Sequence, residues 1–187
     1  IETIARAIPI DSLLYVKEHP IQKEKLWRHV EDYKKIISIP NVKLIHPSIN
    51  SLKLVQMSEG IISISGTTGF EGLFYKKPVI IFGDEHYEKL SMVTKIQKIN
   101  NLSTEIKNAI TNFKFNQNEL NLFMVILNKL SLAVPYASMM KDGVSLSSIQ
   151  RNGENFDVTN SHFENFIGKY SDSFTLIAKA ILSKSIE

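Results

Sequence analysis

Several features that define common protein classes are missing from this sequence. It contains no cysteine, which excludes disulfides, a thiolate nucleophile and thiolate metal ligands, and which permits a reducing compartment. Its 22 basic and 19 acidic side chains leave a formal net charge of only +3, spread along the chain, which is too weak for a nucleic-acid-binding surface. The longest apolar stretch, around residues 120–134, is interrupted by Asn128 and Lys129, so we expect no membrane span.

What remains is the composition of a soluble globular chain, with 187 residues of which 43% are hydrophobic. The chain begins with Ile1 inside a helical pattern rather than with Met. We therefore expect it to be a piece of a longer protein.

Apolar periodicity predicts short strands that alternate with helices in the first half of the chain. This alternation indicates an α/β fold with a Rossmann-like parallel sheet covered by helices on both faces, followed by a helical C-terminal tail. The expected domains are a Rossmann-like domain over 1–115 and a helical extension over 116–187 that packs on it. Strands are expected at 12–16, 42–45, 60–65 and 78–82, and helices at 1–8, 26–37, 51–57, 67–75, 85–99, 103–113, 117–133 and 161–185, with a surface loop over 135–160.

The segment Ser-Gly-Thr-Thr-Gly at 65–69 follows a buried strand and precedes a helix, at the edge where open parallel sheets bind ligands. Its glycines remove side chains that would block a ligand, and its hydroxyls and the unpaired N–H groups of the helix start suit a phosphate. Thr68 with Glu71 also has the form of a capping box, which needs no ligand. The local pattern leaves both interpretations open. The candidate phosphate ligands here are Ser65, Gly66, Thr67 and Thr68.

A second candidate follows the first strand, where alternation places Lys17 and His19 on one side of the chain and Glu18 on the other. A His ring N–H can bind a phosphate oxygen, Pro20 fixes the turn that directs it, and Lys17 adds positive charge. A solvated His in a strand-ending turn explains the same local pattern without a ligand. His46 at the end of the next strand either lines the cleft or only forms a turn.

Carboxylates occur at two further places. Glu71 is suited to hydrogen-bonding the hydroxyls of a ribose. The segment 84–88 contains three acids and a His, but no spacing in it resembles a metal site, and acids at a helix start usually favour the helix dipole. We therefore expect no metal.

Four segments together resemble one protein family. They read YVKEHP at 15–20, PNVKLI at 40–45, ISGTTGFEG at 64–72 and KPVIIFG at 77–83. Their order, spacing and strand-end placement are similar to those of bacterial capsule polysaccharide biosynthesis proteins, over residues 1 to about 100. That family includes transferases of the sugar acid Kdo from its cytidine-monophosphate donor.

The resemblance implies a glycosyltransferase of the two-domain glycosyltransferase B architecture, with this chain as the C-terminal, donor-binding half. It implies that His19 and the 65–68 segment hold the donor phosphate and that Glu71 lies near the nucleotide's sugar. No metal and no cofactor are implied beyond the nucleotide-activated sugar, and no nucleic acid. A glycan or glycolipid acceptor and the catalytic base would belong to the other domain. The enzyme is expected in the cytoplasm, at the inner face of the membrane.

Other activities remain open on the same fold. Teichoic-acid polymerases, which move glycerol phosphate from a cytidine-diphosphate carrier, similarly have a His-Pro pair, a Ser/Thr strand-end motif and an acidic-Tyr segment like 84–87. Nucleotide-sugar 2-epimerases use similar Gly/Ser loops. A non-catalytic domain of this fold would bind a nucleotide or a protein without turnover.

Overall fold

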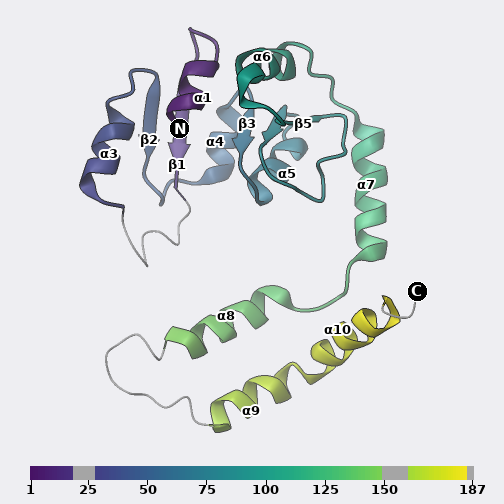
Figure 1. Cartoon of the computed structure of the whole chain (residues 1–187). Coiled ribbons are helices and arrows are strands. Elements are labelled where there is room, and N and C mark those ends of the chain that lie inside the picture. Colours follow the sequence, from purple (N-terminus) through teal and green to yellow (C-terminus); the bar gives the residue numbers. More distant parts are fainter. Residues whose placement is uncertain (19–27, 149–159, 185–187) are drawn as a thin grey trace. The chain divides into compact units, whose positions relative to one another are not determined.

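The computed structural model describes residues 1–18, 28–148 and 160–184 (Figure 1). The chain divides into two compact units, Ile1–Met124 and Val125–Glu187. The strands of the first unit are β1 (Leu14–Lys17), β2 (Val42–Ile45), β3 (Ile61–Ser63), β4 (Val79–Ile81) and β5 (Val93–Lys95). Its helices are α1 (Glu2–Ala7), α3 (Val30–Ile37), α4 (Ser51–Met57), α5 (Thr67–Phe74), the 3-10 turn η1 (Ile99–Asn101) and α6 (Leu102–Thr111), and α7 (Gln117–Leu130) runs into the second unit.

Every strand pairing in the described part of the first unit is parallel. Strand β1 pairs with β2, with Leu14 opposite Val42. Strands β3, β4 and β5 form a second ladder in that order, with Ile62 opposite Ile80 and Ile80 opposite Thr94. Parallel strands flanked by helices confirm the expected Rossmann-like α/β fold, although the strands pair as two sheets.

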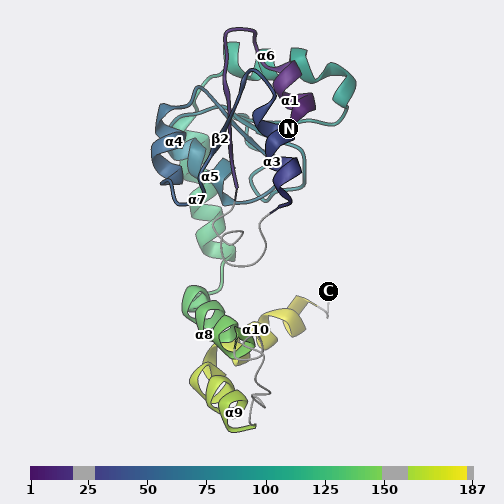
Figure 2. The same cartoon turned by 90° about the vertical axis from the view of Figure 1, so that its left-hand side faces the viewer.

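Alternate residues of β4 enter two different hydrophobic cores, because successive side chains of a strand point to opposite faces. Val79 and Ile81 pack in one core with residues of α4, α5 and α7, whereas Ile80 packs in the other with residues of α1 and α6. All three side chains are fully buried. Figure 2 shows α4 and α5 together, and α1 with α6. Both faces of the ladder are thus covered, so we look for a ligand site at the ends of its strands.

The expected helix over 85–99 is wrong. Turns follow β4, and residues 93–95 form β5, which pairs with β4. Val93 and Thr94 are β-branched and favour a strand, and Leu90 and Met92 are buried in the core without a helix. The correction places a further strand end, that of Lys95, beside the end of β4.

The second unit consists of helices in its described part: the end of α7, α8 (Tyr136–Ser148), α9 (Asn160–Lys169) and α10 (Ser171–Lys184). The expected loop over 135–160 is therefore wrong in its first half, where Tyr136, Met139 and Met140 have helical spacing. The helix expected over 161–185 is two helices, separated at Tyr170. The expected packing of this extension on the first unit stays a prediction.

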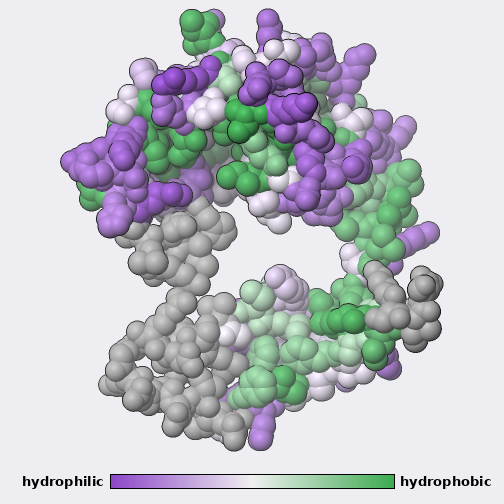
Figure 3. Space-filling model, viewed as in Figure 1, coloured by the Kyte–Doolittle hydropathy of each residue, from purple (hydrophilic) through white to green (hydrophobic). Residues whose placement is uncertain are grey.

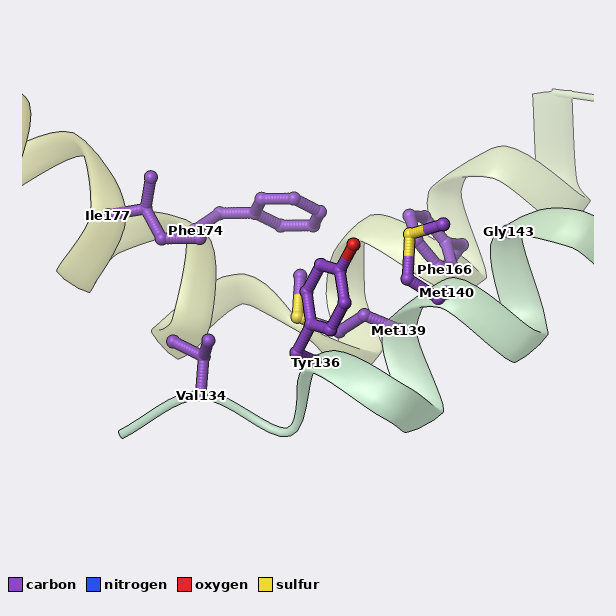
Figure 4. Close-up of a pocket in the computed structure, with 8 residues that line it drawn as sticks. All are labelled: Val134, Tyr136, Met139, Met140, Gly143, Phe166, Phe174 and Ile177. Atoms are coloured by element: carbon purple, nitrogen blue, oxygen red, sulfur yellow. The ribbon is translucent and has the colours of Figure 1, made fainter. Parts of the chain in front are cut away.

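These helices leave much apolar surface uncovered (Figure 3). An apolar pocket of about 360 Å³ opens between α8, α9 and α10, lined by Val134, Tyr136, Met139, Met140, Gly143, Phe166, Phe174 and Ile177 (Figure 4). Among the helices that the structure describes, none combines the length and the apolar composition needed to cross a membrane.

Candidate functional site

The 65–68 segment lies at the carboxyl end of β3. Ser65 and Gly66 form the turn after the strand, and Thr67 and Thr68 are the first two residues of α5. All four are exposed. Within the described ranges, no hydrogen bond occupies the hydroxyls of Ser65, Thr67 or Thr68. Three hydroxyls and a helix start therefore face solvent at one edge, an arrangement open to an anion.

The alternative interpretation, a capping box, is wrong. Gly66 occupies the N-cap of α5 with a φ of +113°, and no side chain caps the helix. Thr68 lies inside the first turn, where its backbone cannot take the extended conformation of an N-cap residue. Glu71 lies in the second turn of α5 and is half-buried. Its role at a ribose stays a prediction.

Two residues of the loop after β4 form hydrogen bonds with the backbone of Gly66. The Glu85 carboxylate accepts a hydrogen bond from the Gly66 N–H, and the Tyr87 hydroxyl donates to the Gly66 carbonyl oxygen over 2.8 Å. Burial, with a further contribution from the Glu85 charge, raises the pKa of Tyr87 to about 12, so the hydroxyl stays protonated at neutral pH. Tyr87 therefore does more than pack in the core, because its hydroxyl also bonds to the candidate loop.

Two glycines of α5 serve packing. A Cβ at Gly69 would lie 2.5 Å from the Tyr87 hydroxyl oxygen, and one at Gly72 would lie 2.8 Å from Cγ1 of Ile61. A Cβ at Gly66 would meet no atom within 4 Å, although its positive φ strains any other residue. Gly69 therefore makes room for Tyr87 and not for a ligand, which corrects the sequence interpretation.

At the end of β1, Lys17 is half-buried and its Nζ donates to the Glu18 carbonyl oxygen over 3.4 Å. His19 lies outside the described residues. The Glu18 side chain is only 7% exposed; it forms an ion pair with Arg28 and accepts a hydrogen bond from the Tyr33 hydroxyl over 2.7 Å. Burial raises the pKa of the Glu18 carboxyl, but the hydrogen bonds from Arg28 and Tyr33 outweigh it, so the pKa lies below its usual value. This network fixes the strand end that precedes His19.

A basic residue that sequence reasoning missed ends β5. Lys95 pairs with Asp84 and, over 2.6 Å, with Glu88. The hydrogen bond from Lys95, and then that from Lys89, lowers the pKa of Glu88 to about 2. Interpreting this segment as a helix hides Lys95 as a strand-end residue, whereas the β-branched pair 93–94 before it is the signal for a strand.

The two other histidines near this edge have local contacts. His46 Nδ1 lies 2.6 Å from the Ser48 hydroxyl and accepts from the Ser48 N–H over 3.2 Å, as in a turn. The His86 ring stacks on Phe123 with centroids 6.0 Å apart and meets the edge of Phe70. Across the residues with described positions, no three His, Asp or Glu side chains gather as metal ligands.

Parallel strands covered on both faces, with hydroxyls and a helix start at their carboxyl ends, define a Rossmann-like α/β protein with a candidate anion site. A family model described as capsule polysaccharide biosynthesis protein matches residues 1–126, which include the whole first unit. The chain therefore belongs to this family, as the sequence resemblance indicated, and has a role in capsule synthesis. Neither a curated protein nor a solved structure matches it.

Proposed function

We propose that the first unit binds the nucleotide-activated sugar of a capsule glycosyltransferase, and that this donor is a cytidine-monophosphate sugar such as CMP-Kdo. The observation that carries the proposal is the start of α5, where Thr67 and Thr68 expose their hydroxyls and no side chain caps the helix. Free N–H groups and the positive end of the helix dipole favour a phosphate there. Membership of the capsule family supports the reaction class.

In this proposal the donor phosphate lies against the hydroxyls of Ser65, Thr67 and Thr68 and the N–H groups that follow Gly66, and Lys17 and His19 add positive charge from the end of β1. As the bond between the anomeric carbon and the phosphate oxygen breaks, the departing nucleotide gains negative charge, which these groups stabilise. An acceptor hydroxyl forms the new bond to the anomeric carbon and loses its proton to a base outside the described residues. Glu71 is assigned to the ribose, and we assign no catalytic base among the described residues.

We further propose that the chain is the donor-binding half of a glycosyltransferase B architecture. The acceptor, a glycan or glycolipid, would then be bound by another part of the enzyme, at the inner face of the cytoplasmic membrane. The reaction would need no cofactor besides the nucleotide-activated sugar.

Thermal unfolding with CMP, CDP or UDP tests the proposal, because a ligand that binds only the native state stabilises it. At a concentration of about 100 times Kd the gain is about 2.7 kcal/mol, or roughly 5–10 °C in Tm for a chain of this size. Thr67→Ala removes a charge-assisted hydrogen bond of about 1.5–3 kcal/mol, so the affinity falls by roughly 10- to 150-fold. His19→Ala should act in the same direction. Thr104→Ala is the matched control, since Thr104 is an exposed threonine in the first turn of α6.

The nucleotide series separates the alternatives. A response to UDP but not to CMP or CDP contradicts the cytidine donor, and no response to any nucleotide contradicts the proposed function and favours a domain with another partner. Glycerol-phosphate transfer is a second candidate, because the acidic-Tyr segment typical of that family contacts Gly66 through Glu85 and Tyr87. With the full-length enzyme and labelled donors, a product that retains the donor phosphate would favour it over sugar transfer.

A further inference from the structure

The hydroxyl of Tyr87 reaches the candidate loop from inside the core. Tyr87 is fully buried, and its ring stacks on Phe70 with centroids 5.6 Å apart. A tyrosine that is needed only for packing leaves its hydroxyl to water or to the nearest polar group. Here the hydroxyl donates to the carbonyl oxygen of Gly66, 21 positions earlier in the chain. The contact therefore joins the core to the start of α5.

Room for this contact depends on Gly69. A Cβ at that position would lie 2.5 Å from the Tyr87 hydroxyl oxygen and 3.2 Å from the ring carbon that bears it. Glycine in a helix interior lowers helix stability, so its presence there needs a compensating contact. That contact is made by the Tyr87 hydroxyl, which lies beside Gly69 and donates to the Gly66 carbonyl oxygen.

Glu85 completes the attachment. Its carboxylate accepts from the Gly66 N–H, and its side chain is 13% exposed. The N–H and the carbonyl of Gly66 are thus both engaged by one loop, while Gly66 itself has a φ of +113°. The groups of this segment that remain available to an anion are the Ser65 hydroxyl and the N–H groups and hydroxyls of Thr67 and Thr68. Fixing Gly66 fixes the direction of these groups, because they lie next to it in the chain.

We propose that Tyr87 is a positioning residue for the phosphate site: its hydroxyl, together with the Glu85 carboxylate, holds Gly66 in the conformation that directs Thr67 and Thr68 at the ligand. Its effect on nucleotide affinity rests on the proposed function, whereas its effect on the loop of the free protein does not. Tyr87 acts through Gly66 and does not itself touch the ligand.

Tyr87→Phe removes the hydroxyl and keeps the ring in the core. Because Gly66 is exposed, water can replace the lost partner, and the variant should fold. We expect amide hydrogen exchange at Gly66, whose N–H is bonded to Glu85, to accelerate at least tenfold and CMP affinity to fall about tenfold. Tyr75→Phe is the matched control, since Tyr75 packs against the same core and has no hydroxyl hydrogen bond within the described ranges. It should change neither quantity.

A second pair of variants covers the case in which Tyr87→Phe does not fold. Glu85→Ala removes the acceptor of the Gly66 N–H and should accelerate its exchange, while Glu85→Gln retains a side-chain oxygen and should restore it. Unchanged amide exchange in both Tyr87→Phe and Glu85→Ala overturns the inference. If the wild type binds CMP and Tyr87→Phe binds it with the same affinity, the inference is also overturned. If the wild type binds no nucleotide but the exchange of Tyr87→Phe accelerates, the proposed function fails and the loop attachment stands.

Discussion

Replacing Gly69 with alanine tests whether α5 is packed as tightly against Tyr87 as the structure indicates. The new Cβ would lie 2.5 Å from the hydroxyl oxygen and 3.1 Å from Cγ1 of Val79, where ordinary contacts are 3.4–4 Å. Overpacking of this kind costs about 1–3 kcal/mol, and loss of the hydrogen bond to Gly66 adds about 0.5–1.5 kcal/mol. Alanine returns about 1 kcal/mol of helix propensity. We therefore expect Gly69→Ala to lower the free energy of unfolding by about 0.5–3.5 kcal/mol, measured by urea denaturation followed by circular dichroism.

Two further variants decide the cause of that loss. Gly168→Ala in α9 makes the same chemical change where a Cβ meets nothing within 4 Å, so it should keep or raise stability. In a Tyr87→Phe background the closest contact is absent, and the cost of Gly69→Ala should shrink by about 1 kcal/mol or more. If Gly69→Ala is as stable as Gly168→Ala, then the Tyr87 hydroxyl does not lie in close contact with Gly69 and α5 is not packed tightly against it.

Two other measurements test the contacts around the candidate site. Pairing, chiefly with Lys95, lowers the pKa of Glu88 from 4.5 to about 2, so it stabilises the fold fully above about pH 4.5, and this contribution is lost as the pH falls toward 2. Tm should therefore fall less on acidification in Glu88→Gln than in the wild type. An equal fall of Tm with pH in the two proteins would contradict the pairing. Leu120→Ala in α7 should lower the free energy of unfolding by about 2–5 kcal/mol, because Leu120 is buried in the first unit. Leu122→Ala at an exposed site should change it by no more than about 0.5 kcal/mol. Similar losses in the two variants would show that α7 is packed differently.

The parts of the fold that were predictable are those with local signals. The strand at 42–45 and the helix at 51–57 agree with the structure, because apolar spacing and a capping residue, Asn50, mark them directly. Asn50 Oδ1 accepts from the N–H groups of Leu52 and Lys53. The edge that carries the 65–68 segment was predictable for the same reason, since the carboxyl end of a buried strand can be located without knowing the neighbouring strands.

The parts that were not predictable depend on pairing across the chain. Strand β5 has three residues, and its pairing with β4 outweighs the helical spacing of the apolar residues before it. The role of Tyr87 depends on a contact with Gly66 that no local pattern encodes. The sequence therefore identifies the 65–68 segment at the strand ends, whereas the structure adds Lys95 and shows which contacts hold Gly66 there.

Helix α5 lacks features that normally stabilise a helix. A side-chain cap contributes about 1 kcal/mol to a helix, and glycine inside a helix costs a similar amount, yet α5 has no such cap and contains Gly69 and Gly72. Core packing explains both internal glycines, since Tyr87 and Ile61 occupy the space that their side chains would need. It does not explain the uncapped end, where Gly66 is exposed and its φ of +113° is a conformation that a capping Ser, Thr or Asp would adopt only with strain. Local rules fail most often where a protein needs a group for something other than stability, and an uncapped helix start with two adjacent threonine hydroxyls is the arrangement that a phosphate would complete.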